Sequence, residues 1–269
     1  MTARVAVAAT ASFGADVLGR LAGQRPIACL VTRPDAPAGR GRRLAPPPAK
    51  VAAERLGIPV VQPERLDSGL ELGAEVVVVV AYGLLVPGEL LDERLWLNVH
   101  PSLLPRWRGA APVERALIEG DRETGVTIIR LVEELDAGPI AAQRRFAIES
   151  DDDAGAVYAR AAETAVELLG HVLSDPQPTF VPQADEGITY AAKLGPVDRA
   201  LDLRRPAREL VDRVRALSPH IGARTELEGR PVTVWRARIT SGGAFEPVEV
   251  QPDGGRRMSY EAWRHGLHG

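Results

Sequence analysis

Five consecutive valines, Val76–Val80, constrain the fold more than any other feature of the chain. A strand that is apolar on both faces of its pleat suits the centre of a parallel sheet, where helices cover each side. Other short β-branched runs alternate with helical stretches, which predicts an α/β fold with an open, doubly wound, mostly parallel sheet. Ligands bind such sheets beyond the carboxyl ends of the strands. The predicted strands span residues 5–9, 27–31, 60–62, 76–80, 95–99, 125–131 and 140–148, and the predicted helices span 13–22, 49–56, 113–118 and 153–172.

The alternation stops after about residue 180. A helix is expected at 207–217, followed by antiparallel strands at 225–228 and 232–239 that are joined by a turn at Gly229. This pattern indicates a second, smaller, β-rich unit. The expected boundaries are 1–183 for the large domain, 184–205 for a linker and 206–269 for the small domain.

Composition excludes several classes of protein. The 269 residues are 45% hydrophobic and 26% charged, unlike a disordered chain or a disulfide-rich miniprotein. No stretch approaches 18 uninterrupted apolar residues, so we expect no membrane span and a cytoplasmic protein. The single cysteine, Cys29, suits a buried strand. No metal site is expected, because zinc-type spacings are absent and His265 and His268 resemble a C-terminal tail.

The net charge of -3 argues, taken whole, against a nucleic-acid partner. The charge is unevenly distributed, however. Residues 200–269 contain 12 arginines and 9 acidic residues, a net of +3, which leaves -6 for residues 1–199. A basic loop and a mildly basic C-terminal unit on an acidic body predict that RNA binding, where it occurs, is moderate and salt-sensitive.

Asn98 and His100 are two residues apart at the carboxyl end of a predicted strand. The two-residue period of a strand places both side chains on one face. An amide donor beside an imidazole suits the stabilisation of an oxyanion in a tetrahedral intermediate. The alternative is that Asn98 caps the strand turn and His100 is a buried histidine with satisfied hydrogen bonds.

Asp136 lies in a loop between two predicted strands, beside the charged Glu133 and Glu134. The commonest role of such an aspartate is that of a turn residue. The functional interpretation pairs Asp136 with His100, so that the carboxylate orients the imidazole. Separation along the chain does not show whether these two residues meet.

Residues 32–50 form a basic stretch with five prolines and two glycines. Arginine flanked by glycine suits close approach to phosphate, and long loops in compact domains are often functional. The alternative is a floppy surface loop. Neither a dinucleotide-binding fingerprint nor a Walker loop is present. Five basic residues stand against Asp35: Arg33, Arg40, Arg42, Arg43 and Lys50.

Together these stretches resemble the folate-dependent formyltransferase family. The family's N-[VI]-H-x-S-L-L-P signature is present at 98–105 and continues as R-W-R-G-A-A-P at 106–112. The likeness covers most of residues 1–240 and returns at 251–258. Three further motifs match: D-x-G at 136–138, P-D-x-P-A-G-R-G at 34–41, and A-Y-G-L-x-x-P at 81–87.

The resemblance implies a Rossmann-like catalytic domain and a small OB-like β-barrel. It also implies that an amine attacks the formyl carbon of 10-formyltetrahydrofolate, and that no metal takes part. Asn98 and His100 would stabilise the oxyanion, while Asp136 would hold His100 and assist proton transfer. The implied donor-binding residues are Leu84, Leu85, Val86, Ser102, Leu103, Leu104, Pro105 and Gly138.

The A-G-R-G loop and the extra C-terminal unit point to the branch of the family that formylates initiator methionyl-tRNA. Arg40 matches the key arginine of that loop. A monomer is expected. The implied tRNA-binding residues are Arg33, Arg40, Arg42 and Arg43.

Two departures from the family pattern concern the first turn and the C-terminal unit. The family's A-G-T-P-[DE]-F reads A-A-T-A-S-F at 8–13, and residues 240–243 lead almost directly to 245–250, so the barrel is shortened by more than one strand. Formylation of another amine, a sugar nucleotide or glycinamide ribonucleotide, is one alternative, slightly favoured by the short barrel. A non-catalytic RNA-binding relative is another, against which the presence of Asn98, His100 and Asp136 argues.

Overall fold

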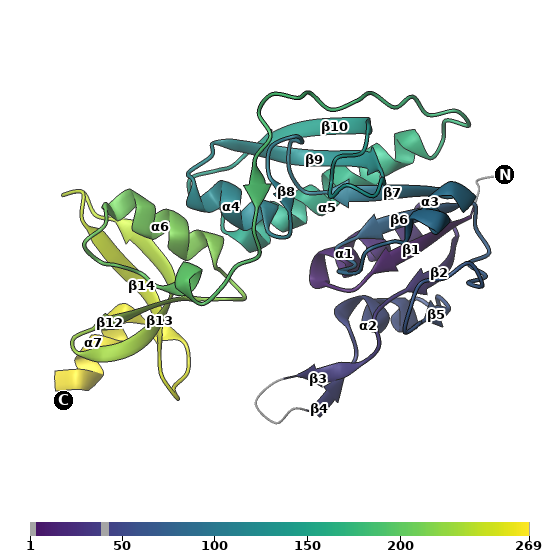
Figure 1. The fold of residues 1–269 in the computed structure, drawn as a ribbon. Coiled ribbons are helices and arrows are strands. Elements are labelled where there is room, and N and C mark those ends of the chain that lie inside the picture. Colours follow the sequence, from purple (N-terminus) through teal and green to yellow (C-terminus); the bar gives the residue numbers. More distant parts are fainter. Residues whose placement is uncertain (1–3, 39–42, 269) are drawn as a thin grey trace. The chain divides into compact units, whose positions relative to one another are not determined.

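The computed structural model describes residues 4–38 and 43–268 (Figure 1). Contacts between residues divide the chain into two compact units. Both units are discontinuous in sequence, whereas the boundaries expected above are continuous, and those boundaries stay predictions. The first unit comprises Met1–Arg108, Gly125–Arg145 and Ala159–Thr189, and the second comprises Gly109–Thr124, Phe146–Tyr158 and Tyr190–Gly269.

A seven-stranded sheet runs through the first unit in the order β10-β9-β7-β6-β1-β2-β5. The valine run is β6, which pairs in parallel with β1 on one side and β7 on the other. β2 and β5 extend the parallel part, while β9 is antiparallel to β7. The mostly parallel sheet predicted from the sequence is confirmed. The strands are β1 (Val5–Ala9), β2 (Ile27–Val31), β5 (Val60–Val61), β6 (Val76–Val80), β7 (Leu95–His100), β9 (Glu123–Arg130) and β10 (Ile140–Ala147).

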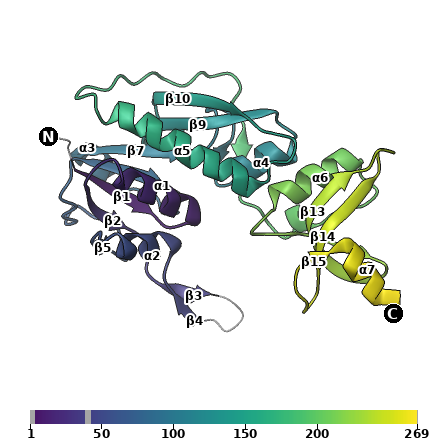
Figure 2. The ribbon, with the colours of Figure 1, turned by 180° about the vertical axis from the view of Figure 1, so that it is seen from behind.

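Helices cover both faces of this sheet. Helix α1 (Ser12–Ala22) and helix α5 (Ala154–Val172) lie side by side on one face (Figure 2), where the Arg20 Nη1 and Glu163 Oε1 atoms are 3.2 Å apart. α2 (Pro48–Arg55) packs near β2 and β5, and α3 (Gly88–Glu93) precedes β7. Alternate strand residues, among them Ala6, Val77 and Trp96, form a core cluster with Leu72 and with Leu90 of α3.

The basic stretch contains a short antiparallel hairpin of β3 (Ala36–Ala38) and β4 (Arg43–Ala45). A polar network closes its base. The Lys50 ammonium donates to both carboxylate oxygens of Asp35, at 2.8 and 3.0 Å, and to the Gln62 amide oxygen at 2.9 Å. The hydrogen bonds from Lys50 and Gln62 hold the pKa of Asp35 below its usual value. The base of the hairpin, which we call its root, is therefore ordered by the contacts among Asp35, Lys50 and Gln62.

The second unit contains a four-stranded antiparallel sheet in the order β12-β13-β14-β15. Helix α6 (Ala207–Ala216) packs on β13 and β14, and helix α7 (Tyr260–His268) packs on β14 and β15. Their core includes Leu210, Val234, Val250 and Trp263. A small antiparallel domain is confirmed, and no pairing joins β12 to β15 within 43–268. The strands are β12 (Ala223–Leu227), β13 (Arg230–Ile239), β14 (Phe245–Pro252) and β15 (Met258–Ser259).

Two segments are more ordered than their sequence indicates. The interpretation of the C-terminal residues as a tail was wrong, because the buried Trp263 anchors them as α7. The expected linker contains β11 (Tyr190–Ala191), which pairs with β8 (Arg108–Gly109), and a 3₁₀ turn (Val197–Arg199). Asp198 in that turn accepts a 2.7 Å bond from Arg115 in α4 (Pro112–Ile118). Within 4–38 and 43–268, no helix is both long and apolar enough to cross a membrane.

Candidate active site

Asn98 and His100 project from the same face of β7, as the two-residue period predicts, and both are buried. Pairing on both sides of β7 fixes their backbone. Asn98 pairs with Val79 of β6 and Ile129 of β9, and His100 pairs with Thr127 of β9. The two side chains therefore sit on an interior strand of the sheet.

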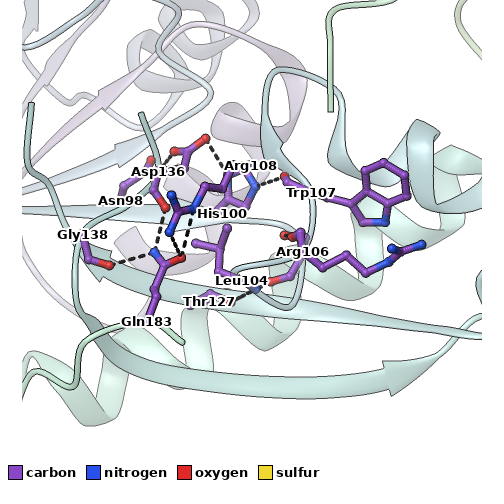
Figure 3. Close-up of polar contacts among 11 residues, drawn as sticks. Asn98, His100, Leu104, Arg106, Trp107, Arg108, Thr127, Asp136, Gly138 and Gln183 are labelled. Carbon is purple, nitrogen blue, oxygen red and sulfur yellow. Dashed lines mark hydrogen bonds and ion pairs between the residues drawn. The ribbon is translucent and has the colours of Figure 1, made fainter. Parts of the chain in front are cut away.

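Asp136 meets both residues, which sequence separation left undecided (Figure 3). Its Oδ1 atom accepts a 3.1 Å hydrogen bond from Asn98 Nδ2, and its Oδ2 atom lies 3.6 Å from His100 Nδ1. The first is a hydrogen bond, whereas the second is an ion-pair distance. Asp136 is 8% exposed and adopts a φ of 50°, in the left-handed region that aspartate tolerates better than most residues. The carboxylate thus stands beside both polar side chains of β7.

The other nitrogen of His100 is engaged by the backbone. His100 Nε2 lies 2.7 Å from the carbonyl oxygen of Trp107. A carbonyl only accepts, so Nε2 carries the proton and donates it there. Trp107 is held in turn, because its amide donates to Thr189 Oγ1 at 2.9 Å. This leaves Nδ1 as the nitrogen of His100 that faces Asp136.

Gln183 and Arg108 bind the loop that carries Asp136 (Figure 3). The Gln183 amide nitrogen donates to the carbonyl oxygens of Asp136 and Gly138, at 2.7 and 2.8 Å. Its amide oxygen accepts from the buried Arg108, from Nε at 3.2 Å and from Nη2 at 2.9 Å. Neither residue was identified from the sequence, where Gln183 stands in a polar stretch without a motif.

Thr127 and Gln143 hold the turn that follows β7. Thr127 donates to the Ser102 carbonyl at 2.7 Å and accepts from the Leu104 amide at 3.1 Å. Gln143 donates to Thr127 Oγ1 at 2.8 Å and to the Leu104 carbonyl at 2.9 Å. The Ser102 hydroxyl donates to the Arg106 carbonyl at 2.7 Å. Of the predicted donor-binding residues in this turn, Ser102 and Leu104 are buried, while Leu103 and Pro105 are half-buried.

Apolar side chains are exposed in the two loops near this polar cluster. Leu84 is 40% exposed and Leu85 is 82% exposed in the loop after β6, and Leu135 is 54% exposed beside Asp136. The two loops are neighbours, because the Glu133 carboxylate lies within 2.2 Å of where a Gly88 Cβ would be. Val86 is half-buried in the core. The arrangement offers apolar surface next to a buried group of hydrogen-bonding side chains.

Gly138 has a packing role, whatever else it does. A Cβ atom at Gly138 would lie 1.7 Å from the carbonyl oxygen of Arg130. Only glycine allows the returning loop to approach the end of β9 so closely.

The predicted tRNA-binding arginines divide into two groups. Arg40 and Arg42 lie outside the described residues, and Arg43 is exposed on β4. Arg33 points elsewhere: its Nη1 atom is 3.9 Å from where a Gly83 Cβ would be, in the loop after β6. There, burial raises the pKa of Tyr82, and the charge of Arg33 partly offsets the rise.

Comparisons with known proteins assign the chain to a family. The formyl transferase model matches residues 3–173, and the model of the formyl transferase C-terminal domain matches 193–246. The chain belongs to the formyl transferase family. One relative of this formyl transferase is the methionyl-tRNA formyltransferase of Halorhodospira halophila, which is 46% identical over 99% of this chain and 97% of its own.

Solved structures share the fold of this formyl transferase. The methionyl-tRNA formyltransferase from Clostridium thermocellum aligns with a TM-score of 0.65 at 14% identity, covering 96% of this chain and 99% of that one. HypX from Aquifex aeolicus, solved in complex with tetrahydrofolic acid, aligns with a TM-score of 0.63 at 17% identity over 97% of this chain. This formyl transferase spans about half of HypX, with 46% of that chain covered.

Proposed function

We propose that the chain transfers the formyl group of 10-formyltetrahydrofolate to the free α-amino group of initiator methionyl-tRNA. The placement of the Asp136 carboxylate against Asn98 Nδ2 and His100 Nδ1 carries the chemical part of this proposal. The acceptor is supported by relatives named methionyl-tRNA formyltransferase, such as one 38% identical over 95% of this chain, from Methylococcus capsulatus.

In the proposed reaction the methionyl nitrogen attacks the formyl carbon, and the carbonyl oxygen gains the negative charge of a tetrahedral intermediate. Asn98 Nδ2 carries two protons, one of which is bonded to Asp136 Oδ1, so the second can stabilise the oxyanion. His100 can donate to the oxyanion only through a proton on Nδ1, because its Nε2 proton is held by the Trp107 carbonyl. The positions of both donors are set before substrate binds.

One proton must move as the intermediate collapses. The attacking amine loses it, and the folate nitrogen receives it as the carbon–nitrogen bond to the donor breaks. The Asp136 carboxylate accepts the proton from the amine and passes it to the folate nitrogen. His100 Nδ1 lies 3.6 Å from Asp136 Oδ2 and shares the charge of the carboxylate. The product is formyl-methionyl-tRNA with tetrahydrofolate.

Different observations support the binding of each substrate. The exposed Leu84 and Leu85 offer apolar surface for the folate ring system, and HypX, a relative in fold, was solved with tetrahydrofolic acid. For tRNA, the exposed hairpin that bears Arg43 supplies positive charge, because Asp35 at its base is already paired with Lys50. We propose that the enzyme acts as a cytoplasmic monomer.

A formylation assay with purified protein tests the proposal. The protein is incubated with 10-formyltetrahydrofolate and methionyl initiator tRNA, with methionyl elongator tRNA in a parallel reaction. Formyl-methionine is expected on the initiator tRNA. If neither tRNA carries formyl-methionine but an amino sugar nucleotide or glycinamide ribonucleotide is formylated, that amine is the acceptor and methionyl-tRNA is not. Failure with every amine would refute the formyl-transfer function.

A further inference from the structure

We propose that Gln183 is a positioning residue for the reaction, which acts with Arg108 to set the place of the Asp136 carboxylate. This inference rests on the proposed function and deepens it. Gln183 does not reach the carboxylate itself: both of its donor contacts go to the backbone of the loop, at the Asp136 and Gly138 carbonyls. Its effect on the chemistry must therefore pass through Asp136.

The orientation of the Gln183 amide is fixed by chemistry at both ends. An arginine only donates, so the two contacts from Arg108 identify the end of the amide that carries oxygen. The two carbonyl oxygens only accept, so the opposite end must be nitrogen, and both of its protons are used. A flipped amide would place oxygen against two carbonyls and nitrogen against a guanidinium.

The loop needs such a clamp because of its conformation. Asp136 has a φ of 50°, which costs free energy for a residue with a side chain. Gln183 bonds the carbonyls on both sides of Ala137, and thereby holds the turn closed directly after Asp136. Loss of these bonds removes two of the contacts that hold the loop with the carboxylate beside Asn98 and His100.

The same segment also secures His100. Thr189, six residues after Gln183, accepts from the Trp107 amide at 2.9 Å, and its own carbonyl accepts from the Arg108 amide at 2.9 Å. The Trp107 carbonyl is the group that receives the Nε2 proton of His100. One stretch of chain, 183–189, thus holds both the loop that carries Asp136 and the backbone partner of His100.

Two substitutions at Gln183 separate positioning from folding. Gln183→Glu keeps the length and an oxygen for Arg108, but removes both donors to the loop and places a carboxylate against two carbonyls. Gln183→Ala removes the clamp altogether. We expect kcat to fall about ten- to hundredfold in each variant, with a KM for the folate donor within about twofold of wild type, since small displacements of reacting groups cost rates of this order. Gln177→Ala, at an exposed position of the preceding segment, is the matched control and should keep the wild-type kcat.

A double-mutant cycle gives the decisive comparison. If Gln183 acts only through Asp136, adding Gln183→Ala to Asp136→Ala should leave the residual kcat unchanged. A full further loss in the double variant, or a wild-type kcat in Gln183→Glu, would overturn the inference.

A measurement that does not depend on enzyme activity tests the role of Gln183 independently of the proposed acceptor. Amide hydrogen exchange of residues 136–138 should become faster in Gln183→Ala than in wild type, while exchange in β6 stays the same. If the wild-type protein fails to formylate methionyl-tRNA, the proposed function fails and the exchange result still decides on the clamp. Unchanged exchange at 136–138 would contradict the clamp whatever the acceptor is.

Discussion

His100 Nδ1 faces Asp136 Oδ2 across 3.6 Å, while Nε2 of the same ring donates to the Trp107 carbonyl. The two nitrogens therefore have different tasks. Nε2 anchors the ring to the backbone, and Nδ1 faces a buried carboxylate. Asn98 Nδ2 completes the group from the same strand and donates to the other oxygen of the same carboxylate.

Replacing Asp136 with asparagine should lower kcat about 10²- to 10⁴-fold, the usual contribution of a positioned acid–base group. The amide keeps the size of the side chain but cannot accept the proton of the attacking amine. Steady-state kinetics with both substrates would measure the loss, and donor binding by calorimetry should stay near the wild-type value. Asp151→Asn, an exposed carboxylate, is the control. A kcat within tenfold of wild type for Asp136→Asn would contradict its assignment.

Replacing Asn98 with alanine should lower kcat about 10²- to 10³-fold, as expected for the loss of one oxyanion donor. The near-isosteric Asn98→Asp should be at least as damaging, because it would put a second carboxylate about 3.1 Å from Asp136 Oδ1. Single-turnover rates at saturating substrate would compare the variants. Asn98→Asp with higher activity than Asn98→Ala would show that size, rather than donation, is what matters at this position.

The arginines of the hairpin should govern affinity for tRNA and leave the chemical step intact. Arg40→Ala, at a position outside the described residues, and Arg43→Ala on β4 should each raise the KM for tRNA. Each should also reduce the slope of log affinity against log salt by about one, the loss of one phosphate contact. Filter binding at several salt concentrations would measure this, with the exposed Arg65→Ala as control. An unchanged slope in both variants would exclude the hairpin from the tRNA interface.

Glu114 in α4 should make the second unit less stable as the pH rises. Burial raises the pKa of its carboxyl, and hydrogen bonds from its own backbone and from Tyr158, at 3.0 Å, offset part of the rise. The folded state then holds the proton more readily than the unfolded state, so stability falls from about pH 4.3, the usual value for glutamate, up to the raised pKa. Glu114→Gln removes this titration but can still accept from Tyr158.

Urea unfolding between pH 4 and 7 would test this expectation. The free energy of unfolding of Glu114→Gln should vary less with pH than that of wild type and exceed it at pH 7. Glu119→Gln, exposed at the end of the same helix, should follow the wild-type curve. Parallel curves for wild type and Glu114→Gln would mean that Glu114 is ionised without cost.

Two glycine substitutions should have opposite signs. Gly138→Ala places a Cβ 1.7 Å from the Arg130 carbonyl and should destabilise the protein by about 1–3 kcal/mol, as overpacking usually does. Gly19→Ala, in α1, meets no atom within 4 Å and should stabilise the protein by about 0.5–1 kcal/mol through helix propensity. Urea midpoints would give both values. Equal stabilities of the two variants would show that the loop at Gly138 relaxes freely.

The sequence predicted those parts of the structure that depend on local periodicity. The valine run became the interior strand β6, and the spacing of Asn98 and His100 correctly placed both on one face of β7. The contact of Asp136 with that pair followed from no local pattern, because it depends on a left-handed residue and a loop that folds back. From the residues alone the pairing was one interpretation beside the commoner role of a turn residue, and the family resemblance supported it.

Gln183 lay beyond prediction for a different reason. Its partners are 47 and 45 residues away along the chain, at Asp136 and Gly138, and both are backbone carbonyls, which every residue has. No residue type at those positions signals such a contact. Helix α7 was also missed, although Tyr260, Trp263 and Leu267 follow a helical spacing and all pack on the core of the small domain. The interpretation as a tail rested on the two histidines and overlooked this spacing.

The closed base of the hairpin has a consequence for molecular recognition. Asp35, Lys50 and Gln62 order the root of β3 and β4 in the free protein, through side chains that belong to three different segments. The configurational entropy of that root is thus lost during folding and not at the encounter with a partner. The hairpin therefore leaves the domain in a fixed direction before a partner binds, and the free energy of association does not include the cost of ordering its base.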